Sequence, residues 1–179
     1  AIKKQLDEDA EAPDDKDELI AFIDDITKGG GRAMVDLADL ARKYYFHPST
    51  KGSSSIKKVL PAVMSSSAFL KRTYSQPSYG APEGVASINF ERVAWWQQGA
   101  NGEVVDPYQL LVSQLGALDA PAVQPEAVNQ GGAASYAYLR LQFEDLNQDQ
   151  RESLRVGLLR YCELDTLAML LIFKAWIHD

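Results

Sequence analysis

Cysteine and histidine are scarce in this chain. Its 179 residues contain one cysteine, Cys162, and two histidines, His47 and His178. One cysteine cannot form an internal disulfide, and the three residues do not have the spacing of a zinc site, so the sequence predicts a cytoplasmic protein without structural zinc. A cysteine nucleophile is the weakest catalytic hypothesis, because no histidine is near Cys162 in the sequence and a helical cysteine is expected to be buried and inert.

Long hydrophobic runs are also absent. No apolar run reaches the roughly 18 residues that a membrane-spanning helix needs, so we expect no membrane contact. The first ten residues lack the apolar stretch of a signal peptide. With 46% apolar residues, the chain is long enough for one globular domain with a sizeable core. Because it begins with Ala1 and not with methionine, we expect a processed chain or a part of a longer protein.

Acidic residues are absent from one long segment. Residues 40–82 contain no Asp or Glu, whereas residues 1–25 contain ten acids and three lysines and account for the net charge of −7. The acid-free segment, called the basic belt below, combines seven Lys and Arg residues with six interleaved Tyr and Phe residues. Such a combination can contact the phosphates and stack on the bases of a single-stranded nucleic acid. The alternative is that its cations are solvated and its aromatic residues belong to the core.

Five cations of the basic belt are the candidate nucleic-acid contacts. Lys57 and Lys58 come first, because they fall in the first turns of an expected helix, where a positive charge opposes the helix dipole. That unfavourable position points to a use other than helix stability. Arg42, Lys43 and Lys51 are the next candidates.

The hydrophobic periodicity predicts a mostly helical chain. Apolar residues recur at helical spacing in residues 17–27, 33–46, 55–64, 133–146 and 148–176, with an interruption at Pro61 in the third segment. Asn147 followed by Gln150 is a capping-box pair that predicts where the last helix begins. Residues 92–108 read as a β-hairpin around a Gly-Ala-Asn-Gly turn, with Trp95 and Trp96 on opposite faces and one of them a contact candidate.

These segments define the expected fold class and domains. We expect an α+β fold that is mostly α-helical with a small β-hairpin. Residues 1–16 are expected to be a flexible acidic arm. Residues 17–179 are expected to form a single domain, with a loop-rich and hairpin-containing insertion at about 74–130.

An aspartate interrupts the most apolar part of the last helix. Residues three and four positions apart lie on one side of a helix. On one side of this helix they are Leu154, Leu158, Tyr161, Asp165, Ala168 and Ile172. This side is apolar except for Asp165 and the amphipathic Tyr161. A buried, unpaired carboxylate is unfavourable, so Asp165 is expected to be a hydrogen-bonded neutral acid, to pair with Lys57 or Arg140, or to bind a metal ion. In the alternative, Asp165 reaches solvent at the edge of the helix, and the core side is defined by Leu159, Leu167 and Leu171.

The spacing Tyr161-x-x-x-Asp165 also permits a specific chemistry. In metal-dependent phosphodiester hydrolysis, carboxylates hold two divalent ions about 4 Å apart. A tyrosine hydroxyl one helical turn from a metal-ligating aspartate can orient the attacking water. Asp165 is therefore the candidate metal ligand and Tyr161 the candidate catalytic partner.

Several stretches of the chain resemble a bacterial domain-of-unknown-function family. The most specific are GSSSIKKVLP and YCELDTLAM, and the resemblance covers about residues 17–177, with further matches in YGAPEGVASINF, GEVVDPYQLL and GGAASYAYLRLQF. That family looks like a branch of the RNase H-like, proofreading-type 3′→5′ exonucleases of the DEDD group. Tyr161 and Asp165 match the last motif of its tyrosine subtype. The resemblance implies a hydrolase of nucleic acid with Mg²⁺ or Mn²⁺ as cofactor.

The other acids of that family pattern have no counterpart in this sequence. The pattern starts with an Asp-x-Glu on a first strand, and no strand-like apolar run here carries one. The resemblance thus implies that this chain is the C-terminal part of a nuclease-like domain and that it is inactive alone. Its partner is then an upstream nuclease region of the same protein or another protein chain. A second reading is a non-catalytic helical module that binds protein or nucleic acid, with Trp95, Trp96 and the acidic arm as contacts.

Overall fold

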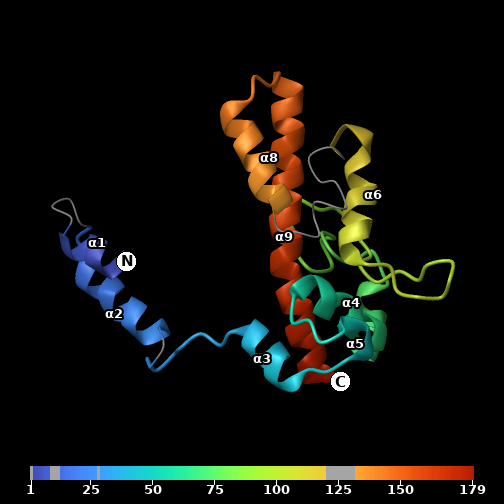
Figure 1. Cartoon of the computed structure of the whole chain (residues 1–179), viewed down its shortest axis with the longest axis horizontal. Helices are drawn as coiled ribbons and strands as arrows, with labels where there is room; N and C mark the ends of the chain where they lie inside the picture. The colour runs from blue at the N-terminus through green and yellow to red at the C-terminus, as the bar shows by residue number, and fades with distance from the viewer. Residues whose placement is uncertain (1, 9–12, 28, 120–131) are drawn as a thin grey trace. The chain divides into compact units, whose positions relative to one another are not determined.

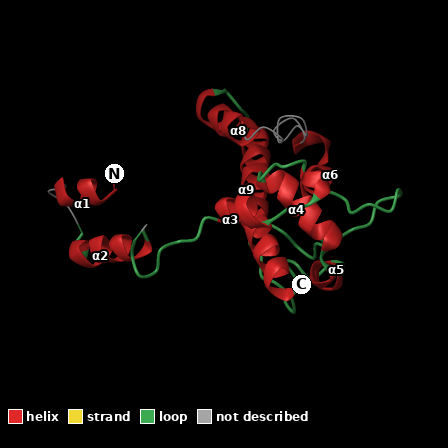
Figure 2. Cartoon of the chain, turned by 60° about the horizontal axis from the view of Figure 1, so that its bottom comes forward, coloured by secondary structure: helices red, strands yellow, loops and turns green. Residues whose placement is uncertain are grey.

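The structure is a computed structural model that describes residues 2–8, 13–27, 29–119 and 132–179. In these ranges the chain forms eight α-helices and no β-strand, which confirms the mostly helical prediction (Figures 1 and 2). No described helix is long and apolar enough to cross a membrane. The helices are α1 (Ile2–Glu8), α2 (Lys16–Ile26), α3 (Leu37–Tyr44), α4 (Ile56–Ser66), α5 (Ala68–Tyr74), α6 (Pro107–Asp119), α8 (Gly132–Phe143) and α9 (Gln148–His178), with a short 3-10 turn at Pro48–Thr50.

The chain divides into two units after Leu37. The first unit contains α1 and α2, whose contacts include an ion pair between Lys3 and Asp24 and a second between Lys16 and Asp7. None of its described residues is buried. The flexible arm expected at residues 1–16 is not what is observed, because residues 2–8 form α1, and the boundary between the two units lies later, after Leu37.

The second unit, Ala38–Asp179, is organised around α9. This helix has 31 residues and contacts α4, α5, α6 and α8, and Figure 1 shows α8 beside its first half and α4 and α5 beside its last turns. Asn147 and Gln150 form the expected capping box, with each side chain accepting a backbone N–H of the other residue. The predicted start of α9 is therefore confirmed.

The core side of α9 combines parts of both sequence expectations. Its buried residues are Leu154, Gly157, Tyr161, Leu164, Leu167, Ala168, Leu171, Ile172 and Ala175. Leu159, which the alternative assigned to the core, is 40% exposed. Asp165 lies at the margin of the buried side and is half-buried. Each fully buried leucine on this side contributes roughly 2 kcal/mol through burial, so the core packing fixes the rotation of α9 and, with it, the position of Asp165.

Pro61 does not interrupt its helix. Helix α4 runs through Pro61, which leaves only the carbonyl of Lys57 without its usual backbone donor. The residues around the proline, Leu60, Ala62, Val63 and Met64, are at most 2% exposed. Burial of both turns against α9 outweighs the missing hydrogen bond, which the sequence pattern alone does not reveal.

The expected hairpin is present only as a turn. Among the described residues its sole ladder contact is one antiparallel bridge, between Gln98 and Val104, so no strands form. The chain then enters α6, a helix absent from the sequence expectations for residues 74–130. Its start follows a recognisable rule, because Asp106 accepts the backbone N–H of Tyr108 and Pro107 occupies the first helical position.

The loop at residues 75–93 is fastened to α9 by one carboxylate. Glu163 accepts hydrogen bonds from the Tyr79 hydroxyl (2.7 Å), the Ser87 hydroxyl and both the backbone and side-chain nitrogens of Asn89 (3.1 and 2.6 Å). Gly80 allows the tight fold of this loop, because it has a φ of +77° and a Cβ there would lie 2.1 Å from the Phe90 carbonyl oxygen. Tyr79 and Phe90 in turn pack around the fully buried Trp95.

Hydrogen bonding sets the ionisation of Glu163. Burial alone raises the pKa of its carboxyl, but the bonds from Ser87, Tyr79 and Asn89 outweigh burial and hold the pKa below its ordinary value of 4.5. A carboxyl whose folded-state pKa is lowered stabilises the fold above the unfolded-state pKa, and that contribution is lost as the pH falls through the folded-state value.

Replacing Glu163 therefore tests how the loop is held. We expect Glu163→Gln to lower the free energy of unfolding by about 2 kcal/mol at pH 7, because hydrogen bonds to a charged acceptor are lost. The difference from wild type should shrink as the pH falls below about 4.5, measured by urea unfolding at several pH values. Glu152→Gln on the same helix, where Glu152 is exposed and pairs with Arg155, is the control and should leave the free energy of unfolding close to the wild-type value. Equal stability of the two variants at pH 7 would contradict the proposed fastening.

Candidate functional site

Asp165 finds its partner in α6. The Tyr108 hydroxyl donates a hydrogen bond of 2.6 Å to Asp165 Oδ1, and no described basic side chain forms an ion pair with this carboxylate. Arg140, one of the expected partners, pairs with Glu144 instead. A tyrosine donor was not among the three expected solutions, and it became apparent only once α6 placed Tyr108 against α9.

Lys57 lies beside this hydrogen bond and does not join it. Its ammonium nitrogen is 5.3 Å from the ring centroids of both Tyr108 and Tyr161, in the cation–π geometry. The same nitrogen is buried and has no hydrogen-bond partner among the residues that the structure describes. The rings of Tyr108 and Tyr161 are 6.2 Å apart and are 4% and 7% exposed. The sequence-predicted pair of Tyr161 and Asp165 is therefore brought together with Lys57, by α4, α6 and α9.

Asp106 adds a second acid to the group. Burial raises the pKa of its carboxyl, while the hydrogen bond from the Tyr108 N–H and the charges of Lys58 and Lys57 oppose the increase. We call Lys57, Asp106, Tyr108, Tyr161 and Asp165 the Asp165 cluster.

The phenol of Tyr108 is a permanent donor in this cluster. Burial raises the pKa of Tyr108, and the hydrogen bond to Asp165 and the negative charge of that carboxylate raise it further. The hydroxyl therefore stays protonated at physiological pH and holds Asp165 Oδ1 in place. Asp165 Oδ2 accepts no hydrogen bond from the described part of the chain. Glu163, by contrast, uses both of its oxygens in four bonds to the loop.

The described residues do not make a metal site by themselves. Within the described ranges, no group of three or more His, Cys, Asp or Glu side chains is arranged to hold a metal ion. The carboxylate of Asp165 has one unbonded oxygen, which is a fitting ligand atom, but a single ligand does not retain Mg²⁺ or Mn²⁺. A metal at Asp165 therefore depends on carboxylates from outside these residues.

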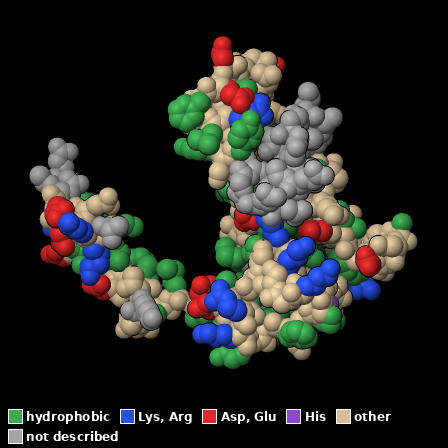
Figure 3. All heavy atoms as spheres, in the orientation of Figure 1, with side chains coloured by type: hydrophobic (Ala, Val, Ile, Leu, Met, Phe, Trp, Pro, Cys, Tyr) green, Lys and Arg blue, Asp and Glu red, His purple; other side chains and the backbone are tan. Residues whose placement is uncertain are grey.

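The cations of the basic belt have different surroundings. Lys43, Lys51 and Lys58 are exposed, and Arg42 is exposed and pairs with Asp39. On the face drawn in Figure 3, Lys and Arg side chains gather over α3 and the start of α4. These four residues are accessible to a phosphate, whereas the ammonium of Lys57 is covered by Tyr108 and Tyr161.

The aromatic residues of the basic belt divide in the same way. Tyr74 and Tyr79 are buried in the core, as the alternative reading of this segment expected. Tyr44 and Phe46 are 80% and 83% exposed and flank the last turn of α3. The core interpretation of the basic belt thus applies to Tyr74 and Tyr79, whereas Tyr44 and Phe46 are exposed as the nucleic-acid interpretation requires.

Two further sequence expectations concern tryptophan and cysteine. Trp95 is fully buried, while Trp96 is half-buried, donates its indole N–H to the Met64 carbonyl (2.9 Å) and lies under Lys71. Both rings are therefore held by the body of the protein. Cys162 is exposed and not buried as expected, because it lies on the side of α9 opposite Leu164.

The remaining members of the site were missed for identifiable reasons. Tyr108 and Asp106 belong to α6, whose Asp-Pro start is a helix signal that was read as the end of a hairpin. Glu163 lies two residues from both Tyr161 and Asp165. It is also an acidic residue in the same apolar run, which is the feature that identified Asp165 as a candidate. Its role in binding the loop at 75–93 depends on tertiary contacts that local sequence does not specify.

Removal of the Tyr108 hydroxyl tests the central hydrogen bond. We expect Tyr108→Phe to lower the free energy of unfolding by about 1–3 kcal/mol, because a half-buried carboxylate loses its donor. Asp165→Asn should cost less than about 1 kcal/mol, since the amide oxygen still accepts from Tyr108. Urea unfolding measures both, with Tyr138→Phe at an exposed tyrosine of α8 as the control. Wild-type stability in Tyr108→Phe would show that the bond is not made in solution.

The chain was also compared with known proteins. No protein-family model, no curated protein and no solved structure gives a significant match. Functional assignment therefore rests on the residues of the Asp165 cluster and of the basic belt.

Proposed function

We propose that residues 38–179 form the C-terminal part of a metal-dependent, nuclease-like domain that hydrolyses phosphodiester bonds in DNA or RNA. Asp165 is the metal ligand in this proposal, and Tyr161 is the water-orienting residue. The observation that carries it is the state of Asp165, which is half-buried in the middle of α9 with one oxygen fixed by Tyr108 and the other unbonded within the described residues. An oriented carboxylate with a free oxygen is preorganised for a cation.

The metal, Mg²⁺ or Mn²⁺, enters the proposal only together with further acids. The described residues hold no metal-ligating group of three or more side chains. In this proposal the other carboxylates come from an upstream nuclease region of the same protein or from another chain. We assign no catalytic step to residues 1–179 alone. The finer fold assignment, an α+β RNase H-like domain in a cytoplasmic bacterial protein, belongs to the same proposal.

The surface of α9 supports an incomplete domain. Apolar side chains follow one another along one side of α9 and are partly exposed within the described part of the second unit, with Met169, Leu170, Phe173 and Ile177 40–54% exposed. A contiguous apolar face of this kind normally packs against another element. The strands of an RNase H-like sheet are the covering element in our proposal.

Single-stranded nucleic acid is the proposed partner of the basic belt. Lys58, Arg42, Lys43 and Lys51 are exposed and contact phosphates in this proposal, close in sequence to the exposed rings of Tyr44 and Phe46. Lys57 reaches a phosphate only if the rings of Tyr108 and Tyr161 move away from its ammonium.

A non-catalytic helical interaction module is the second candidate function. It is favoured by α8, where Tyr136, Tyr138, Leu139 and Phe143 are 50–82% exposed, an apolar surface suited to a protein partner. The tryptophans first considered for such contacts are held by the body of the protein.

Cleavage assays test the leading proposal. We expect residues 1–179 not to cleave single-stranded DNA or RNA with Mg²⁺ or Mn²⁺, because they match one of the four acids of the family pattern, and that one acid cannot hold two ions. A longer form that includes the upstream acids should cleave, and Asp165→Asn should reduce its rate more than about 100-fold while leaving its stability nearly unchanged. Asp149→Asn, the same change at an exposed position of α9, is the control. Full activity of Asp165→Asn would remove the catalytic assignment and leave the interaction module.

Titrations at several salt concentrations test the basic belt. The dissociation constant for a single-stranded oligonucleotide should rise with salt, and the slope of the log–log plot should fall by about 0.7 for each phosphate-contacting residue replaced. Replacing Lys43, Lys51 and Lys58 by Gln should therefore flatten the slope, while Lys4→Gln in α1 should not. Salt-independent binding, or none, would count against the belt.

A further inference from the structure

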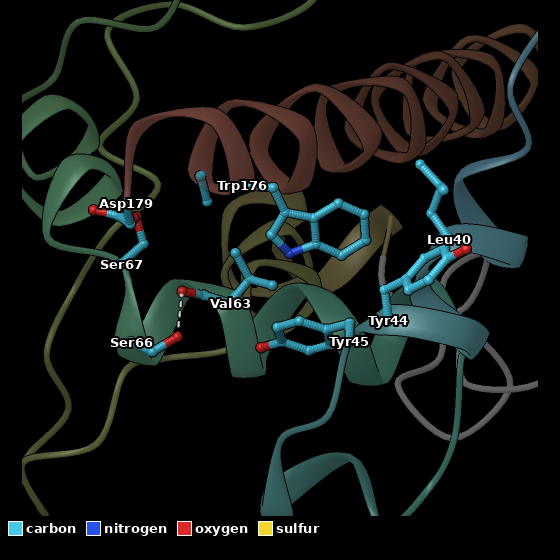
Figure 4. Close-up of a pocket in the computed structure, with 9 residues that line it drawn as sticks. Leu40, Tyr44, Tyr45, Val63, Ser66, Ser67, Trp176 and Asp179 are labelled. Carbon is cyan, nitrogen blue, oxygen red and sulfur yellow. Dashed lines mark hydrogen bonds between the residues drawn. The ribbon is translucent and has the colours of Figure 1, made fainter.

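A cavity of about 560 Å³ lies between α3, α4 and the C-terminal end of α9 (Figure 4). Its volume is in the range of small-molecule binding sites. The walls are mainly apolar and aromatic, and they include Leu40, Tyr44, Tyr45, Val63 and Trp176. In Figure 4, Trp176 lies over Tyr45. Tyr44 and Leu40 are on one side of this pair, and Ser66, Ser67 and Asp179 are on the other. The cavity contains no member of the Asp165 cluster, so it is a separate site.

Two hydrogen-bond donors in its wall have no acceptor. The indole nitrogen of Trp176 and the hydroxyl of Tyr45 are both buried, and neither has a hydrogen-bond partner among the described residues. Their rings contact each other, with centroids 5.5 Å apart and planes inclined by 37°. Buried polar groups in folded proteins are normally paired, so two unpaired donors in one wall indicate acceptors that a ligand supplies.

The other polar groups of the wall are already engaged. The Ser66 hydroxyl donates to the carbonyls of Ala62 and Val63, and the Ser67 hydroxyl donates to the Asp179 carboxylate. Burial raises the pKa of Tyr45, partly offset by the neighbouring Ser66 hydroxyl, so the phenol remains a protonated donor at neutral pH. The Asp179 carboxylate disfavours a phosphate at that end of the cavity, and a neutral ligand fits the charge.

We propose that this cavity binds a nucleobase, which is a flat, neutral, heteroaromatic ring that stacks on aromatic walls and accepts hydrogen bonds from Trp176 and Tyr45. The choice of a nucleobase rests on the proposed nuclease function and gives the basic belt a base-binding subsite. Both donor atoms are buried in the structure, so binding of the base in this proposal includes a reorientation of the Trp176 and Tyr45 side chains that brings their donors to the cavity. The exposed rings of Tyr44 and Phe46 extend the stacking surface beyond it, beside the exposed cation of Lys43.

Nucleosides test the cavity directly. Adenosine and thymidine are titrated into the protein, and the three indole N–H resonances are followed by NMR. The resonance that disappears in Trp176→Phe should shift on binding, while that of the fully buried Trp95 should not. Trp176→Phe and Tyr45→Phe, which each keep an aromatic ring but remove the donor, should each weaken binding about five- to tenfold through loss of one hydrogen bond. Tyr138→Phe on α8 is the matched control and should bind like the wild type.

Three results would overturn the proposal. These are the absence of any nucleoside-induced shift of Trp176, wild-type affinity in both cavity variants, and binding of N-acetyltryptophanamide as tight as that of the nucleosides. The last outcome would identify a site for an aromatic side chain of a protein partner, because the indole ring has no acceptor nitrogen.

Oligonucleotides separate the two sources of the base. A twelve-nucleotide single strand is compared with an abasic strand of the same length and charge. A preference for the normal strand that Trp176→Phe abolishes supports a base within a strand, whereas nucleoside binding without this preference supports a free nucleoside. Equal, salt-dependent binding of both strands without nucleoside binding overturns the cavity proposal and leaves the phosphate contacts of the basic belt intact.

Discussion

The second unit depends on two carboxylates inside one apolar helix. Glu163 and Asp165 are half-buried at the margin of the core side of α9, where donors that reach a carboxylate stabilise it. Glu163 accepts hydrogen bonds from the loop at residues 75–93, and Asp165 accepts one from Tyr108 of α6. Segments without regular strands are thereby fixed to the longest helix of the unit. The positions of the buried aromatic residues around Trp95 and of the Asp165 cluster follow from these two attachments.

Local signals in the sequence were sufficient for the helices with strong caps and periodic faces. The capping box at Asn147 and Gln150 gave the start of α9, and its apolar repeat gave its length. The same signals failed where a tertiary contact outweighs a local preference. Burial of both turns carries α4 through Pro61, and a Gly-rich turn with β-branched neighbours forms one bridge without strands because the following segment becomes α6.

The sequence predicted a candidate site at Asp165, but it did not predict the residues that contact Asp165. Asp165 is conspicuous because a charged residue in an apolar run has to be compensated, which is a local inference. The compensating group, Tyr108, is 57 residues away in sequence and acts from a helix that was not predicted. An inward-facing carboxylate can thus be recognised from sequence, whereas the identity of its donor depends on packing that only the structure supplies.

The contrast between the two carboxylates separates a structural role from a binding role. Glu163 is saturated, with four donors on its two oxygens, and burial together with these bonds leaves it no capacity for a ligand. Within the described residues Asp165 accepts one hydrogen bond, on one oxygen, and the nearby Lys57 of α4 faces the tyrosine rings. If the role of Asp165 were only to hold α6, a neutral acceptor such as asparagine would serve as well without the desolvation of a charge. A charged group with one oxygen that is unbonded within the described residues is the physical basis of the proposed cation site at this position.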